Sequence, residues 1–203
     1  MTRVGISGLS GMIGRNLVEY LGRRPGAGEL ELVAFSRQER PPAFLQEAGI
    51  ACHRVDFTDA ASFEGKLEGL EAFVHLAGSV RAVRPRDFFA GNHEATVVLL
   101  AALKRFGPGV RHLLFASSQS AAGPSGARPA DELDPCRPVS FYGRSKLAAE
   151  EAVRALGTAA APAWTILRLP AVWGPYDQDG LNILRTARRG VLPVLGGEQP
   201  CLS

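Results

Sequence analysis

The chain has 203 residues, of which 46% are apolar and 21% charged, and its formal net charge is +3. This composition excludes a disordered or fibrous chain, and the length fits one large domain or one domain with part of another. The uninterrupted apolar runs are far shorter than the roughly 20 residues that a membrane span needs. We therefore expect a folded globular protein with no membrane partner.

Cysteine and arginine usage narrows the class of protein further. The three cysteines, Cys52, Cys136 and Cys201, lie far apart and form no CxxC pair. Their odd number argues against a disulfide framework and favours a cytoplasmic location, and their spacing predicts no metal site. The arginines are dispersed, whereas a nucleic-acid surface concentrates them on one face. We therefore expect no nucleic-acid partner.

Short β-like runs alternate along the chain with stretches of helical spacing, which predicts a parallel sheet with crossover helices. The expected strands are residues 4–7, 30–36, 50–56, 71–77, 110–117 and 164–169. The expected helices are residues 11–21, 86–106, 141–156 and 181–189. The proline-rich segment 123–138 is expected to be a surface loop. Six strands with intervening helices predict an α/β protein with a Rossmann-type doubly wound parallel sheet over residues 1–170.

The first expected turn carries a spaced array of glycines. Residues 4–14 read V-G-I-S-G-L-S-G-M-I-G, which places Gly8, Gly11 and Gly14 between a strand and a helix. In a dinucleotide site the first glycine permits the tight turn, the second lets a pyrophosphate approach, and the third lets helix and strand pack closely. The helix then directs unpaired N–H groups at the phosphates. The array predicts a dinucleotide site, with a glycine-rich turn that binds nothing as the alternative.

The end of the second expected strand bears on which nicotinamide cofactor fits. An NAD site usually has an acid there for the ribose 2′-hydroxyl, but this strand ends in Ser36 and Arg37. A hydroxyl and a guanidinium bind a 2′-phosphate well, and Arg15 offers a second cation. We expect NADP to be preferred over NAD; the alternative is that both arginines are solvated.

A tyrosine and a lysine lie four residues apart on the expected helix 141–156. Tyr142 and Lys146 therefore project to the same side of that helix. A free phenol has a pKa of about 10, and a neighbouring ammonium lowers it towards the range of a useful base. The fifth strand runs into Ser117 and Ser118, at the sheet edge where such folds bind ligands. The pair predicts acid/base chemistry, and two unrelated surface side chains are the alternative.

With these residues the sequence resembles the extended short-chain dehydrogenase/reductase family, the NAD(P)-dependent epimerase/dehydratase group. The likeness extends from the glycine array to about Gly197. Its further motifs, in chain order, are Asp56 in V-D-F-T-D, His75-Leu-Ala-Gly78, Asn92 before H-E-A-T, Ser117-Ser118, Y-G-R-S-K at 142–146, and R-L-P-A-V-W-G-P at 168–175. An ordered set of this length is highly specific.

The resemblance implies catalytic roles for four side chains. Tyr142 would be the general acid/base, and Lys146 would bind the nicotinamide ribose and lower the phenol pKa. Ser118 would orient the substrate oxygen, with Ser117 the nearest rival and Ser120 a further one. The fourth, Asn92, would shape its helix and hold a proton-relay water. We expect His75, by contrast, to be a strand histidine whose hydrogen bonds are satisfied within the core.

The resemblance also implies a cofactor path. Asp56 and Phe57 would bracket the adenine, and Leu76, Ala77 and Gly78 would line the cofactor between adenine and nicotinamide. The remaining cofactor residues would be Gly8, Gly11, Met12, Ile13, Gly14, Ser36 and Arg37, together with Tyr142 and Lys146.

The chain departs from the family pattern in places. Ala121-Ala122 stands where Val-Tyr is frequent, Ala171 where Asn is common, and Ala77-Gly78 where Ala-Ala is usual. Members typically continue well past this length, so the resemblance implies that the C-terminal substrate lobe is largely absent and that residues 171–203 are its start. Apolar side chains there would then lose cover and favour association, including a homodimer. They are Trp173, Leu181, Leu184, Val191 and Leu192.

Together these observations predict an NADP-preferring oxidoreductase or epimerase-type enzyme. It would move hydride between nicotinamide and a sugar-nucleotide-like or other carbonyl or alcohol substrate. The alternative is a truncated or catalytically idle dinucleotide-binding protein. Such a protein would act as a sensor or bind a partner. Side chains that could face a substrate are Arg81, Arg84, Trp173, Tyr176 and Arg185.

Overall fold

The computed structural model describes residues 1–24, 27–125, 128–156 and 162–191. Its centre is a sheet of six parallel strands in the order β3-β2-β1-β4-β5-β6. The strands are β1 (Thr2–Ser7), β2 (Leu30–Ser36), β3 (Ala51–Arg54), β4 (Ala72–His75), β5 (His112–Ser118) and β6 (Ala163–Leu169). The chain leaves β1 in one direction to β2 and β3 and returns to β4 on the other side. This order confirms the Rossmann-type sheet.

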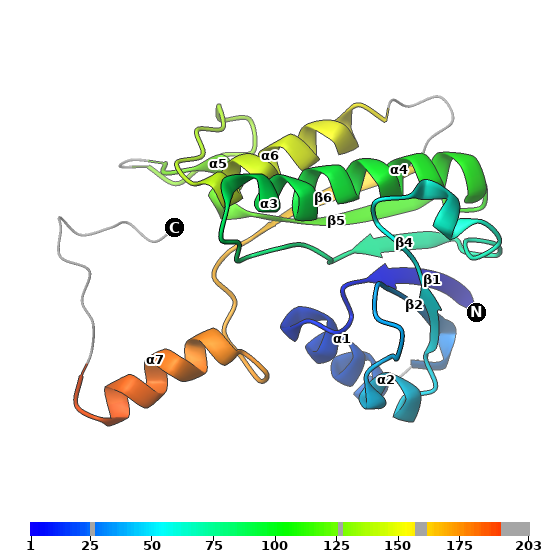
Figure 1. The fold of residues 1–203 in the computed structure, drawn as a ribbon, viewed down its shortest axis with the longest axis horizontal. Coiled ribbons are helices and arrows are strands. Elements are labelled where there is room, and N and C mark those ends of the chain that lie inside the picture. Colours follow the sequence, from blue (N-terminus) through cyan, green and yellow to red (C-terminus); the bar gives the residue numbers. More distant parts are fainter. Residues whose placement is uncertain (25–26, 126–127, 157–161, 192–203) are drawn as a thin grey trace.

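Helices lie on both sides of the sheet, although on the side of α1 and α2 they cover mainly β1 and β2 (Figure 1). They are α1 (Met12–Arg23), α2 (Ala43–Glu47), α3 (Pro85–Phe89), α4 (Ala95–Phe106), α5 (Gln119–Ala122), α6 (Phe141–Arg154) and α7 (Gln178–Arg188). Two 3-10 turns, η1 (Ala27–Glu29) and η2 (Ala60–Phe63), and a π-helical turn, η3 (Ala90–Glu94), complete the set in the described ranges. Helices α4 and α6 lie together on one face, and α1 and α2 lie on the other (Figure 1).

Apolar side chains fill the space on each face. On the side of α4 and α6, Leu99 and Leu103 pack with Phe73 and Phe115 from the strands. On the other side, a smaller cluster is formed by residues of β1, β2, α1 and α2: Val4, Ile6, Leu9, Val18, Ala34 and Leu45. The central strands are apolar runs, as expected for a parallel sheet. On the side of α1, however, β5 and β6 are only partly covered, and Leu167 of β6 is exposed.

The helix expected over residues 86–106 is not continuous, so that prediction was wrong in detail. The structure has α3, then the π-helical turn η3, and then α4. Asn92, in η3, is buried, and its amide bonds the backbone of Ser79 outside the helix. Hydrogen bonds from a helical side chain to a backbone outside the helix favour a π-helical turn at that point. The short helices α2 and α5 were not predicted, because a single turn or two carries no periodic signal.

The chain after β6 passes along α1 before it forms α7. The carbonyl of Pro175 accepts a hydrogen bond from Asn16 in α1 at 2.9 Å. Helix α7 lies beyond the end of the sheet (Figure 1). Trp173, Leu184 and Val191 are 60%, 63% and 59% exposed, as expected for this segment, whereas Leu192 lies outside the described residues. Among the described helices, none is long and apolar enough to cross a membrane.

Candidate dinucleotide and catalytic site

The turn between β1 and α1 has the geometry that a dinucleotide needs. Gly8 has a φ of +82°, and a Cβ there would lie 2.5 Å from the backbone nitrogen of Ala77. A Cβ on Gly14 would lie 2.4 Å from Cα of Leu9, so this glycine lets α1 pack on the turn. Gly11 is the N-cap of α1 and differs from both, since a Cβ there would meet only the carbonyl of Gly8, at 3.3 Å. The space beside Gly11 is therefore open to a ligand.

A groove of about 450 Å³ runs from this turn across the carboxyl ends of the strands. Most of the predicted cofactor residues line it: Gly8, Gly11, Ser36, Arg37, Asp56, Phe57, Leu76, Ala77 and Gly78. The side chain of Ile13 does not, because it lines an apolar cavity on the other side of α1. Met12 lines a second cavity beside the glycine turn. A cofactor in the groove would therefore meet Ile13 through its backbone only.

The two carboxyl ends of β2 and β3 supply polar groups to the groove. Ser36 accepts a hydrogen bond from the backbone N–H of Gln38 at 3.1 Å, and Arg37 is exposed. The carboxylate of Asp56 accepts bonds from the backbone N–H and the hydroxyl of Thr58, both at 2.8 Å, which lower its pKa. Phe57 is buried, with its ring against Phe63, so it serves the core as well as the groove.

Arg15 is not the solvated cation of the alternative reading. Its guanidinium carbon lies 3.6 Å from the centre of the Tyr176 ring and 5.0 Å from that of Phe44, and its Nε is 3.8 Å from the carboxylate of Glu19. These groups form part of the wall of the second cavity, next to Gly11. A positive charge held between two rings beside the glycine turn is available to an anion there.

The carboxyl end of β5 brings Ser118 to the phenol of Tyr142. The tyrosine is half-buried in the first turn of α6, and its phenol interacts with the side chain of Ser118. Burial raises the pKa of Tyr142, while the bond to Ser118 acts to lower it. Of the two rivals, Ser117 is bound elsewhere, to Glu150 at 2.5 Å, and Ser120 donates its backbone N–H to Ser118. Ser118 is thus the serine that the structure places against the phenol.

Lys146 is almost completely buried one helical turn further along α6. Its Nζ donates a hydrogen bond of 2.6 Å to the carbonyl of Ala116 and lies 4.2 Å from the centre of the Phe115 ring. Burial lowers the pKa of Lys146 to about 8, and the carboxylate of Glu150 opposes that effect. The expected lowering of the Tyr142 pKa by Lys146 is not seen here, where burial dominates the phenol. Lys146 lies near the groove, since its Nζ is 3.8 Å from where a Cβ of Gly78 would be.

Asn92 joins the groove to α6. Its side-chain oxygen accepts from the backbone N–H of Ser79 at 2.8 Å, and its nitrogen donates to the Ser79 carbonyl and to the Ser145 hydroxyl. A Cβ on Gly78 would lie 2.7 Å from that oxygen, so a larger residue at this position would displace the Asn92 side chain. The amide thus connects the π-helical turn to Ser79 and α6, and its roles in shaping the helix and in holding a water remain predictions.

His75 was expected to be a core histidine, and the structure confirms it. The residue is fully buried in β4, with Nδ1 2.6 Å from the Ser7 hydroxyl and Nε2 3.2 Å from the Thr96 hydroxyl. Burial, with a smaller effect of Lys146, lowers the pKa of His75 to about 3. The ring is therefore neutral, and it connects β1, β4 and α4.

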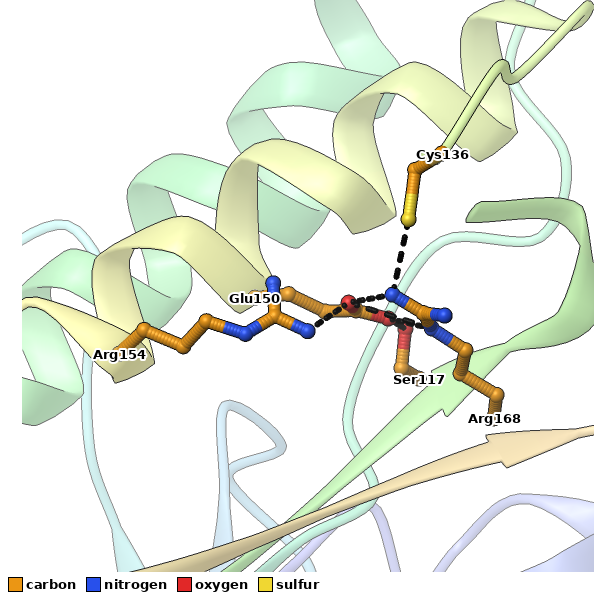
Figure 2. Close-up of polar contacts among 5 residues, drawn as sticks. All are labelled: Ser117, Cys136, Glu150, Arg154 and Arg168. Carbon is orange, nitrogen blue, oxygen red and sulfur yellow. Dashed lines mark hydrogen bonds and ion pairs between the residues drawn. The ribbon is translucent and has the colours of Figure 1, made fainter. Parts of the chain in front are cut away.

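Sequence reasoning missed a buried polar network next to the predicted catalytic residues (Figure 2). Glu150 of α6 is completely buried and binds Ser117 of β5 and Arg168 of β6. Arg154 and Cys136 complete the set. The only sequence signal was that an acid follows Lys146 by four residues, and its partners lie on other elements.

The fold is of the Rossmann type, and the groove lies where proteins of this fold hold a dinucleotide. The profile of the NAD dependent epimerase/dehydratase family matches residues 4–198, so the chain belongs to that family. A ceramide reductase of Caulobacter vibrioides is 31% identical over 196 residues, which are 95% of this chain and 53% of the relative. A UDP-2-acetamido-2,6-beta-L-arabino-hexul-4-ose reductase of Pseudomonas aeruginosa is 29% identical over 89% of this chain and 38% of the relative.

Among solved structures, the chain resembles a dTDP-glucose 4,6-dehydratase of Bacillus anthracis in complex with NAD. The TM-score is 0.80 at 21% identity, over 97% of this chain and 64% of that one, and it shows a shared fold. The chain thus spans about half the length, or less, of the two curated relatives named above.

Proposed function

We propose that this chain carries an NAD(P)-dependent oxidoreductase or epimerase-type reaction in which Tyr142 is the acid/base. The substrate would be a sugar-nucleotide-like or other carbonyl or alcohol compound. The observation that carries the proposal is the pairing of the Tyr142 phenol with Ser118, beside a groove whose glycine turn fits a pyrophosphate. The named relatives act on a UDP-sugar in one case and a ceramide in the other, which supports a carbonyl or alcohol without choosing between them.

The residues of the chain divide the work between binding and proton transfer. Gly8, Gly11 and the N-terminus of α1 would hold the pyrophosphate of the dinucleotide, and Asp56 the adenine. When bound, the nicotinamide would supply or accept the hydride. Ser118 would hold the substrate oxygen and, through its hydrogen bond, favour the phenolate of Tyr142.

NADP is the cofactor that we propose to be preferred. Arg37 is exposed in the groove next to Ser36, where an acid would repel a 2′-phosphate. Arg15 adds a positive charge on the other side of the glycine turn. A guanidinium beside a phosphate forms charge-assisted hydrogen bonds, which a ribose 2′-hydroxyl cannot match. NADPH should therefore bind more tightly than NADH. The cytoplasmic location and a homodimer remain predictions from the sequence.

Tyr142→Phe tests the proposed chemistry because it removes only the phenolic oxygen. Turnover should fall at least about a hundredfold, while the affinity for NADPH stays unchanged. A panel of UDP-sugars and long-chain ketones, read by NADPH absorbance, supplies the substrate. Tyr20→Phe is the matched control, since Tyr20 is exposed in α1 and should tolerate the change.

Two outcomes would count against this assignment. Undiminished turnover by Tyr142→Phe would transfer the acid/base role to another group. Saturable binding of NADPH with no turnover on any member of the panel would instead favour the second reading, an idle dinucleotide-binding protein. The exposed apolar side chains of residues 171–191 support that reading, because they give it a surface for a partner.

A further inference from the structure

Three side chains of helix α6 contact three consecutive residues at the end of β5. Tyr142, Lys146 and Glu150 are spaced four residues apart, so they lie along one side of the helix. Their partners are three consecutive residues of β5: Ser118 for Tyr142, the carbonyl of Ala116 for Lys146, and Ser117 for Glu150. The third of these residues, Glu150, has no part in the proposed chemistry, yet its side chain is the most deeply buried of the three.

Glu150 also ties β5 to β6. Ser117 and Arg168 are opposite each other in the parallel register of these strands, and both reach the same carboxylate (Figure 2). Ser117 donates to Oε1 at 2.5 Å, and Arg168 donates to Oε1 at 3.0 Å and to Oε2 at 2.8 Å. Arg154, one turn along α6, donates to Oε2 at 2.9 Å. Every accepting position of this carboxylate is directed at a donor.

The charge of Glu150 is maintained by these partners. Burial acts to raise the pKa of Glu150, but the hydrogen bonds from Arg168 and Ser117 and the two guanidinium charges outweigh it and lower the pKa. A permanent negative charge therefore lies one helical turn from Lys146. Cys136 accepts a hydrogen bond at 2.9 Å from Nη2 of Arg168, the nitrogen that also donates to Glu150, so this arginine is also held from the loop before α6.

We propose that Glu150 is a positioning residue for the reaction: it holds Ser117, and with it the Ser118 end of β5, against α6, and it keeps Lys146 charged inside the protein. The inference rests on the proposed function, because it assigns a task to the residues around Tyr142. A buried ion pair is by itself weak support for stability, which leaves placement of the site as its distinct contribution.

Other groups near Lys146 cannot substitute for Glu150. Tyr142 lies one turn before Lys146 on α6, and the neutral His75 faces it from β4. From β5 it meets a carbonyl and the Phe115 ring. None of these carries a negative charge in the structure. Removal of the Glu150 carboxylate should therefore make the lysine lose its proton at lower pH.

The titration of Lys146 can be followed directly, because the chain has three lysines, Lys66, Lys104 and Lys146. Lysine labelled with ¹³C at Cε gives three NMR signals, and Lys146→Arg identifies the third. In Glu150→Gln the midpoint of Lys146 should shift to lower pH than in the unmodified protein. Glu151→Gln is the matched control: it is the neighbouring carboxylate on α6, it is exposed, and it should leave the midpoint in place.

Glu150→Gln leaves two arginines without their acid and could prevent folding. The double variant Glu150→Met/Arg168→Met removes the buried pair together, a change that folded proteins commonly tolerate. It should show the same downward shift of the Lys146 midpoint. With a substrate found in the panel, the double variant should have a kcat at least about tenfold lower than the unmodified protein, with little change in the KM for NADPH. As the pH is raised, the kcat of the double variant should begin to fall at a lower pH than the kcat of the unmodified protein.

An unchanged Lys146 midpoint in either folded variant would overturn the proposal, as would an equal shift in Glu151→Gln. A shifted midpoint with unaltered kcat would also overturn it, since the charge would then have no bearing on the reaction. The titration needs no substrate. Failure to find turnover in the unmodified protein would therefore refute the proposed function separately, while the titration still reports on Glu150.

Discussion

At the scale of single residues, two glycines of one turn have different tasks. Gly8 adopts a left-handed backbone conformation, and the segment that follows β4 is so close that a Cβ would overlap the backbone of Ala77. Gly11 has an extended backbone at the N-cap of α1, and its Cα faces open space in the groove. The first glycine is required by the fold, whereas the second leaves room for the dinucleotide that we propose to bind there.

Alanine at each position separates these tasks. Gly8→Ala should lower the free energy of unfolding by about 1–3 kcal/mol or more. The new Cβ would strain the left-handed backbone at this position and would also overlap the backbone of Ala77. Gly11→Ala should change it by less than about 1 kcal/mol, yet weaken dinucleotide binding at least about tenfold. Urea unfolding and fluorescence titration give the two quantities. Equal loss of stability in both variants would contradict this division.

At the scale of elements, buried polar side chains fix the register of the strands, which apolar contacts alone do not specify. His75 connects β4 to β1 through Ser7 and to α4 through Thr96. Glu150 connects α6 to β5 and β6 in the same way, further along the sheet. Such bonds specify register because each buried polar group has one position in which it is satisfied.

The histidine connection makes stability depend on pH in a defined direction. The pKa of His75 is about 3 in the folded protein and 6.5 as a free side chain, so the unfolded chain binds the proton first as the pH falls. Stability is therefore lost from about pH 6.5 downwards, and the loss from pH 7.5 to pH 5 should be about 2 kcal/mol from this residue. Urea unfolding at several pH values measures it.

His75→Gln should flatten the dependence over that interval, because the glutamine has no proton to gain. His112→Gln is the control, since this histidine is exposed at the start of β5. The interval ends at pH 5 so that carboxylates such as Glu150 and Asp56, whose pKa values are lowered, do not yet contribute. An unchanged slope in His75→Gln would show that the ring is protonated in the folded protein or exposed in solution.

At the scale of the whole molecule, much of the architecture follows from local sequence features. The six strands were predicted because buried parallel strands are apolar runs, and the glycine turn because its spacing, between a strand and a helix, is typical of a dinucleotide-binding turn. Tyr142 and Lys146 could be paired from their helical spacing alone. β3 and β4 were each predicted three residues too long, since apolar residues such as Val55 and Leu76 continue beyond the last ladder bond.

The features that escaped prediction depend on contacts between distant segments. The π-helical turn at Asn92 follows from bonds to Ser79, which no periodicity within the helix reveals. The Glu150 network draws its members from β5, α6, β6 and a loop, and each is ordinary in its own sequence context (Figure 2). The raised pKa of Tyr142 likewise depends on burial, which the four-residue spacing could not report.

The central claim is that the groove between the glycine turn and β4 binds a nicotinamide dinucleotide, and direct titration tests it. Isothermal titration of the unmodified protein with NADPH and NADH should show one saturable site per chain, with NADPH the tighter ligand. Arg37→Asp should reverse the order of the two affinities, because it replaces attraction of the 2′-phosphate by repulsion. Tighter binding of NADH by the unmodified protein would contradict the NADP preference alone. Saturable binding of neither dinucleotide would contradict the account as a whole.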